Sequence, residues 1–151
     1  MAAHEHLNPE QVRAIAEAHG DKYFANYKDP VKRDRGCCSD YSDHFGVHGG
    51  LKGTKIKTYA SDPDYAKWTH DINVVPTTQG PYALDFTYLQ FDKTAKMPHF
   101  EPLHEYTARI KQKYPEAIDN PPDPPARSFI KDLYPDMNWE YKGPTNEHGN
   151  W

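Results

Sequence analysis

Apolar residues recur every three or four positions near the N-terminus, which predicts an amphipathic helix. Asn8 can cap this helix, Pro9 suits its first position, and Gln11 stands where a capping box needs it. The Asp29-Pro30 pair predicts its end, because a residue that precedes proline disfavours the helical conformation. The stripe that the helix would bury consists of Val12, Ile15, Ala16, His19, Tyr23 and Tyr27.

Strict alternation of apolar and polar residues predicts strands in the middle of the chain. Residues 68–75 (WTHDINVV) alternate, a loop follows at 76–80, and residues 82–91 (YALDFTYLQF) form the strongest strand pattern. The short polar stretch 92–96 has the character of a hairpin connection, and residues 97–105 would form the return strand.

The remaining segments carry weaker patterns. Residues 31–44 are polar and predict a short helix or a turn, whereas Phe45 and Val47 predict a very short strand. Residues 54–60 predict a short helix, and residues 106–114 predict a final one. The order of elements, helices first and a sheet afterwards, indicates an α+β fold.

Prolines concentrate in the last part of the chain, where half of the 14 lie from Pro115 onward. This composition predicts an extended, Pro-rich tail over residues 115–151 and a folded domain over residues 1–114. We expect the tail to pack on the body or on a neighbouring subunit, because it carries many large apolar residues. These are Phe129, Ile130, Leu133, Tyr134, Trp139, Tyr141 and Trp151.

Composition excludes several classes of protein. Only 36% of the residues are hydrophobic, against a usual ~45–50%, yet aromatic residues supply 13% and can build a core. No apolar run is long enough to cross a membrane, and the N-terminus has no secretory-signal pattern. The net charge of −4 without a basic stripe argues against nucleic acid as a partner. The adjacent Cys37 and Cys38 favour reduced thiols and a cytoplasmic location.

A metal site is the first chemistry to weigh. Cys37, Cys38, His44 and His48 together offer two thiolates and two imidazoles, which satisfy zinc chemically. Adjacent cysteines rarely both reach one metal, so we expect no metal site here and one cysteine buried as a small apolar residue.

Three stretches resemble a known family. They are DYSDHFGVHGGLKG at 40–53, FTYLQFDKTAK at 86–96 and KMPHFEPLHEYT at 96–107. Together, over residues 8–110, the chain resembles the SnoaL-like polyketide cyclases of the nuclear-transport-factor-two-like superfamily, in the form common in fungal biosynthetic clusters. It departs from the pattern at Ala95, where glycine is usual, and at Glu105, where aspartate is usual.

This resemblance implies a curved mixed or antiparallel sheet wrapped around the N-terminal helices. Such a cone-shaped α+β barrel has a deep apolar pocket open at one end. Members bind a hydrophobic small molecule there, some catalyse without a cofactor, and we expect a homodimer formed through the outer face of the sheet.

Candidate catalytic residues lie on the predicted strands. Glu105 aligns with the acidic residue that SnoaL-like cyclases use as general acid/base, and an apolar cavity would make it competent by raising its pKa. His70 and Asp85 lie on adjacent predicted strands and would form a proton-shuttling pair if they face inward, or a surface pair if they do not. His99 is a further candidate. The expected substrate-binding residues are Tyr23, Tyr27, Phe45, Trp68, Phe86, Tyr88, Glu101 and Leu103.

These observations lead to one expected function and two alternatives. The first is a cofactor-free enzyme of secondary metabolism that isomerises, cyclises or dehydrates a hydrophobic carbonyl compound by acid/base chemistry. A binding protein of the same fold without chemistry is the second, and a small structural subunit of a larger complex is the third.

Overall fold

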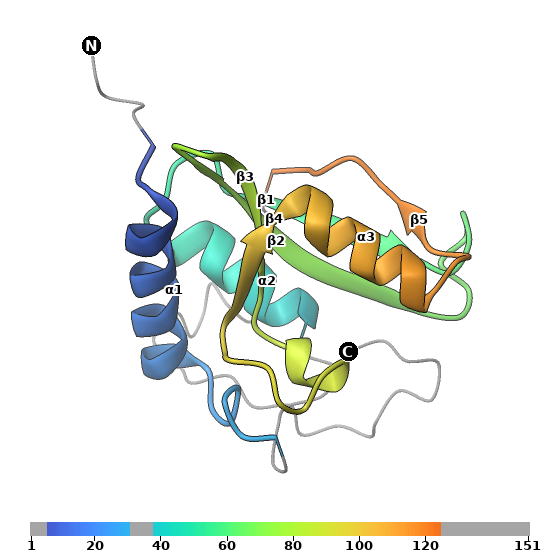
Figure 1. The fold of residues 1–151 in the computed structure, drawn as a ribbon, viewed down its shortest axis with the longest axis horizontal. Helices are drawn as coiled ribbons and strands as arrows, with labels where there is room; N and C mark the ends of the chain where they lie inside the picture. The colour runs from blue at the N-terminus through green and yellow to red at the C-terminus, as the bar shows by residue number, and fades with distance from the viewer. Residues whose placement is uncertain (1–5, 31–37, 125–151) are drawn as a thin grey trace.

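The computed structural model describes residues 6–30 and 38–124 (Figure 1). This part of the chain is α+β, as predicted, with three α-helices and a five-stranded antiparallel sheet. In chain order the elements are α1 (Pro9–Tyr23), α2 (Cys38–His48), β1 (Lys55–Ala60), β2 (Thr69–Thr77), β3 (Gly80–Asp85), the short 3₁₀ helix η2 (Tyr88–Gln90), β4 (His99–Pro102), α3 (Leu103–Lys113) and β5 (Ile118–Asp119).

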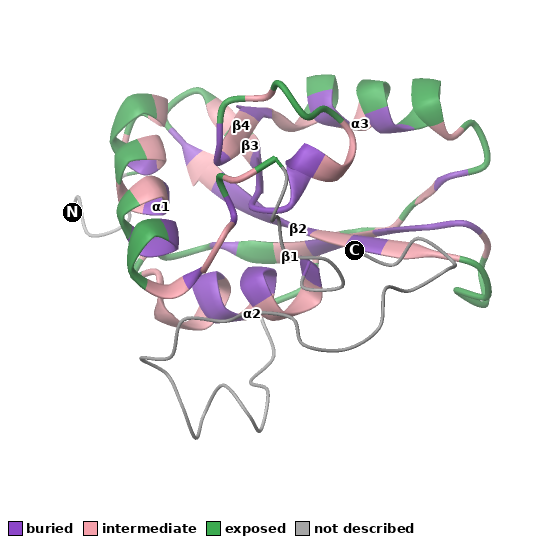
Figure 2. Cartoon of the chain, turned by 90° about the horizontal axis from the view of Figure 1, so that it is seen from below, coloured by how far each residue is buried: buried purple, intermediate pink, exposed green. Residues whose placement is uncertain are grey.

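The strands run in the order β4-β3-β2-β1-β5, and all neighbours pair antiparallel. Helices α2 and α3 cover opposite faces of this sheet (Figure 2). Helices that precede an antiparallel sheet are compatible with the nuclear-transport-factor-two-like superfamily. The sheet is not strongly curled, however, so the expected cone-shaped barrel is not confirmed.

The first helix starts as predicted and ends earlier than predicted. The side chain of Asn8 accepts the N–H of Gln11, and the Gln11 side chain accepts the N–H of Asn8. The helix stops at Tyr23 rather than Asp29 because the chain becomes extended at the next residue and then left-handed at Asn26 (φ 61°). Tyr27 therefore lies outside the helix.

Tyr27 folds back over the last turn of α1. A Cβ added at Gly20 would lie 2.6 Å from the Tyr27 ring, so this helix position accepts only glycine without a shift of the ring. The Tyr27 hydroxyl donates to Asp21 at 2.9 Å and to the Glu17 carbonyl at 3.2 Å. Glycine inside a helix, which normally weakens it, here permits the close approach that buries Tyr27.

Two short elements predicted between residues 44 and 60 have a different type of secondary structure in the fold. Phe45 and Val47 lie within α2 rather than on a strand. Residues 54–60 do not form a helix, because Lys55–Ala60 pairs with β2 along its whole length as β1. Tertiary pairing here overrides a weak local preference.

The strongest strand pattern, residues 82–91, forms a strand only as far as Asp85. The Asp85 carboxylate accepts the N–H of Thr87 at 2.8 Å, which turns the chain out of the sheet and into η2. The predicted loop at 76–80 is shorter than expected, since β2 runs to Thr77 and β3 begins at Gly80 with a φ of 96°.

The predicted return strand at 97–105 is also cut short. Only His99–Pro102 pairs with β3, and α3 begins at Leu103. Pro102 has no N–H to continue the ladder, and its fixed φ suits the residue that precedes a helix. Leu103 and Glu105 therefore lie on a helix, and the predicted helix at 106–114 is confirmed with an earlier start.

Part of the predicted tail belongs to the sheet. Ile118–Asp119 pairs with β1 as β5, and Asp123 bridges to Ile56. Buried Lys57, on β1, forms an ion pair with Asp119. The predicted packing of the apolar residues from Phe129 to Trp151 lies outside the described residues.

A group of histidines is buried between α1 and α2. Nε2 of His19 lies 2.9 Å from Nδ1 of His44, so one ring must donate and the other accept. The pKa of His19 is about 3, well below its ordinary 6.5, first because of burial and then because His44, His48 and Lys22 disfavour a further positive charge.

We expect mild acid to destabilise the protein through His19. The unfolded chain binds a proton there below pH 6.5, whereas the folded chain does so only near pH 3. The stabilising contribution is complete above pH 6.5 and is lost as the pH falls, by on the order of 5 kcal/mol in total. In His19→Leu, the free energy of unfolding from urea titrations should fall less steeply between pH 6.5 and about 4. His6→Leu, at an exposed position, should keep the wild-type slope, and a wild-type slope in His19→Leu contradicts the assignment.

The Lys57–Asp119 pair should respond asymmetrically to substitution. The Lys57 side chain is 6% exposed and that of Asp119 34% exposed, so only Asp119 can regain water when its partner is removed. Asp119→Asn should lower the free energy of unfolding by about 2 kcal/mol, and Lys57→Met by less than about 1 kcal/mol. Urea titrations at neutral pH measure both, and a larger loss in Lys57→Met than in Asp119→Asn contradicts this account.

Candidate functional site

The predicted pairing of His70 and Asp85 is confirmed. His70 lies near the start of β2 and Asp85 is the last residue of β3, and both side chains are 1% exposed. Nε2 of His70 lies 2.8 Å from Oδ2 of Asp85. The pair is therefore an interior histidine–carboxylate pair rather than a surface pair.

Asp85 is held by donors on both carboxylate oxygens. Oδ2 accepts the His70 ring and also the Tyr106 hydroxyl at 2.7 Å. Oδ1 accepts the N–H of Thr87 at 2.8 Å and its hydroxyl at 3.1 Å. Burial alone would raise the pKa of Asp85, but His70, Tyr106 and Thr87 together lower it below its ordinary value. Asp85 is therefore an ionised, fixed carboxylate.

Cys38 completes a line of three groups. It is the first described residue of α2, it is 2% exposed, and its side chain interacts with His70 and raises the pKa of the imidazole. Cys38 and Asp85 thus both act on His70, and Nε2 is the ring nitrogen that Asp85 engages.

Serines of α2 fix the start of the helix against the sheet. Ser39 donates to the Asp71 carboxylate at 2.5 Å, and Ser42 donates to the Asp71 carbonyl at 3.2 Å. On the other side, the Asn73 side chain donates to the Ser42 carbonyl at 2.9 Å. Since Asp71 follows His70 on β2, these contacts set the position of Cys38 relative to the histidine.

The electrostatics favour a charged histidine. Burial alone would lower the pKa of His70, but the Asp85 carboxylate and Cys38 outweigh it and raise this pKa to about 10. His70 is therefore an imidazolium at neutral pH, held between a carboxylate and a thiol. The thiolate is the reactive form of a cysteine side chain.

His99 and Glu101 form a second cluster on β4. Nε2 of His99 lies 2.5 Å from Glu101, whose other oxygen accepts Nε of Arg109 at 2.9 Å. Tyr88 stacks on His99 with ring centroids 3.6 Å apart. Tyr88, His99 and Arg109 line an open hollow of about 550 Å³ on the α3 side of the sheet. The ring centroids of His99 and Tyr106 lie 6.0 Å apart, so the second cluster borders the first.

Glu105 is not brought into the site. It lies in the first turn of α3, its side chain is 52% exposed, and His104 is 3.9 Å away. The expected apolar surroundings that would prepare it as a general acid are therefore absent around this residue.

The expected substrate-binding residues divide between the two faces of the sheet. On the side of α1 and α2, Phe86 packs edge-on against Phe24 and Tyr27 and also contacts Phe45. Tyr23 contacts the rings of His19 and His44 on the same side. On the α3 side lie Trp68 (against Tyr114), Tyr88, Glu101 and Leu103, the last of which lines a hollow of about 490 Å³. The contacts of these residues therefore fall on both faces of the sheet.

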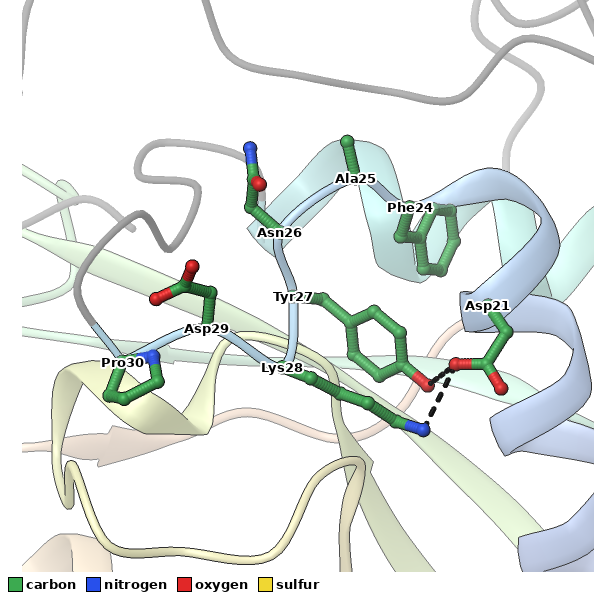
Figure 3. A pocket seen from close by; sticks show the side chains of 8 residues that line it. All are labelled: Asp21, Phe24, Ala25, Asn26, Tyr27, Lys28, Asp29 and Pro30. Carbon is green, nitrogen blue, oxygen red and sulfur yellow. Dashed lines mark hydrogen bonds and ion pairs between the residues drawn. The ribbon is translucent and has the colours of Figure 1, made fainter.

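A larger hollow lies beside the end of α1 (Figure 3). Its volume is about 720 Å³, and Asp21 and the residues from Phe24 to Pro30 line it. Figure 3 shows the Tyr27 hydroxyl and the Lys28 amine both directed at Asp21. These contacts satisfy each other, so the hollow offers no aligned reactive group.

Within residues 6–30 and 38–124, no group of three or more histidine, cysteine and acidic side chains is placed to hold a metal ion. His44 and His48 do lie one turn apart, with ring centroids 4.8 Å apart, while Cys37 is outside the described residues. None of the helices in the described part has the length and apolar character needed to cross a bilayer.

Comparison with known proteins finds no matching family model, no matching curated protein and no matching solved structure. Function must therefore be argued from the site itself.

Sequence reasoning missed the roles of Cys38, Thr87 and Tyr106. One usable signal for Cys38 was present, because a cysteine at a helix start combined with a distant histidine and aspartate is a pattern of nucleophilic sites. The contacts of Thr87 and Tyr106 depend on how the chain turns after β3 and on where α3 packs, and no local pattern reports either.

Proposed function

We propose that this protein is a cysteine-dependent acyl-transferring enzyme. Cys38 is the nucleophile, His70 is the acid/base, and Asp85 orients and stabilises the histidine. The observation that supports this proposal is the line of three buried groups, in which His70 contacts Cys38 and bonds Asp85 at 2.8 Å. The same roles recur on unrelated folds, so the argument needs no relative.

The substrate class follows from the chemistry of the three groups. The Cys38 thiolate attacks the carbonyl carbon of an ester, thioester or amide and forms a tetrahedral intermediate. That intermediate collapses as the bond to the leaving group breaks, and His70 gives its proton to the departing oxygen, sulfur or nitrogen. Water or another nucleophile then loses a proton to His70 and attacks the thioester, which frees the thiolate and completes hydrolysis or transfer.

The size of the acyl donor follows from the burial of Cys38. Because Cys38 is only 2% exposed, small acyl donors are the appropriate first substrates.

A second function keeps specific support. The interior His70–Asp85 pair suits the acid/base isomerisation, cyclisation or dehydration of a hydrophobic carbonyl compound that the SnoaL-like resemblance implies. That function, and homodimer formation, stay predictions. The exposed position of Glu105 removes the best candidate base for this acid/base function. The acid/base function also does not explain why a thiol contacts His70.

The first test is acylation by a small activated ester. Incubation with p-nitrophenyl acetate should release nitrophenol and add one acetyl group at Cys38, located by peptide fragmentation, which distinguishes Cys38 from Cys37. Cys38→Ala should abolish this acylation, whereas Cys37→Ala should retain it. Equal acylation of wild type and Cys38→Ala would remove the proposal.

Substitution of the exposed Glu105 is a control that separates the acyl-transfer function from the acid/base function. Glu105→Gln should leave acylation of Cys38 at the wild-type rate, because the side chain is 52% exposed and outside the three-group line. Loss of acylation in Glu105→Gln, with a wild-type thermal midpoint, would favour the acid/base function instead.

Asp85→Asn should slow acylation of Cys38 by about 10²-fold or more, because an amide neither stabilises the imidazolium nor holds the same tautomer of His70. Initial rates with p-nitrophenyl acetate measure the effect, and circular dichroism checks the fold. A folded Asp85→Asn variant with a wild-type rate would show that the carboxylate takes no part.

A further inference from the structure

We propose that Tyr106, acting from α3, is a positioning residue of this site: its hydroxyl keeps Asp85 ionised and aimed at His70. The inference rests on the proposed function and adds to it a residue that never touches the substrate. It also assigns α3 a role in activity, although α3 covers the face of the sheet opposite to α2, which carries the nucleophile (Figure 2).

The geometry places the hydroxyl on the carboxylate oxygen that faces the histidine. The Tyr106 hydroxyl donates to Oδ2 of Asp85 at 2.7 Å, and Nε2 of His70 lies 2.8 Å from that same atom. Thr87 restrains the other oxygen through its N–H and its hydroxyl. With both oxygens restrained, the carboxylate cannot rotate away from His70.

The hydroxyl can act only as a donor in this place. Tyr106 is 0% exposed, and burial together with the Asp85 charge raises its pKa well above the ordinary value of 10.0. It therefore stays protonated while its neighbour is ionised. A buried carboxylate that accepts several donors is stabilised in its charged form. Removing this donor favours transfer of the proton from His70 to Asp85, which neutralises the pair and removes the imidazolium beside Cys38.

Titratable groups surround this contact from every described element packed against it. The neighbours are His70 from β2, Cys38 from α2, Tyr59 from β1, Tyr88 from η2, and His99 and Glu101 from β4, with Arg109 bonded to Glu101.

Tyr59 offers a matched control. It is also 0% exposed, and its ring centroid lies 5.8 Å from that of Tyr106. Its hydroxyl bonds Thr107 at 2.8 Å rather than the carboxylate. Loss of either hydroxyl removes one hydrogen bond made by a buried tyrosine, but only Tyr106→Phe removes a bond to Asp85.

The experiment measures alkylation of Cys38 by iodoacetamide against pH, located by peptide fragmentation. Variants Tyr106→Phe, Tyr59→Phe and His70→Ala are compared with wild type. Tyr106→Phe should slow alkylation at neutral pH about tenfold and move the acid limb of the rate profile up by about one pH unit. Tyr59→Phe should keep the wild-type profile, even if its thermal midpoint falls as far as that of Tyr106→Phe.

Each alternative outcome has one meaning. If wild type and His70→Ala give the same profile, the proposed function fails. If they differ while Tyr106→Phe matches Tyr59→Phe and wild type, the function stands and the role of Tyr106 is overturned.

Should Tyr106→Phe fail to fold, Thr87→Val tests the same restraint on the other oxygen. It removes the Thr87 hydroxyl, keeps its N–H, and should move the profile in the same direction by a smaller amount. An unchanged Thr87→Val profile would then overturn the proposal.

Discussion

A buried, ionised carboxylate is the constraint on which this structure depends. Asp85 has almost no access to water, so its charge persists only because four hydrogen-bond contacts replace the lost hydration. Those contacts come from β2, from α3 and from the turn after β3. Asp85 thus lies at the end of β3, accepts the hydrogen bond that turns the chain toward η2, bonds Tyr106 of α3 and stabilises the positive charge of His70. The same side chain therefore contributes both to the fold and to the proposed chemistry.

Both faces of the sheet combine apolar packing with buried polar contacts. On one face, α1 and α2 bury rings such as Phe24 and Tyr41, which stack at 4.1 Å, together with the bonded pair His19 and His44. On the other face, Tyr106 of α3 bonds the buried Asp85. Buried polar groups raise the cost of any misplacement, so these contacts specify the geometry of both layers.

Sequence patterns correctly predicted those elements that depend on interactions between residues close together in the chain. The capping box at Asn8 and the alternation along β2 involve residues that are neighbours in sequence, and both were confirmed. The pairing of His70 with Asp85 followed from two adjacent strands. The segment 82–91 misled because its apolar alternation continues past Asp85, where a side-chain hydrogen bond to Thr87 decides the conformation.

The site was only partly predictable for a related reason. The role of Cys38 depends on a histidine 32 positions later in the chain, and helix α2, which Cys38 begins, was itself read in part as a strand. Glu105 was assigned by its alignment with the acidic residue of the SnoaL-like cyclases, within a predicted return strand that in fact ends at Pro102. An error in element type therefore misplaced a candidate side chain.

The chain order of the site has a consequence for synthesis. The proposed nucleophile, Cys38 on α2, is made before its proposed partners His70 on β2, Asp85 on β3 and Tyr106 on α3. A ribosome-bound chain therefore carries the thiol before the groups that would activate it. Under the proposed function the thiol would become reactive only after α3 has been made, which protects the nascent polypeptide, and the thiols and acyl groups around it, from premature modification.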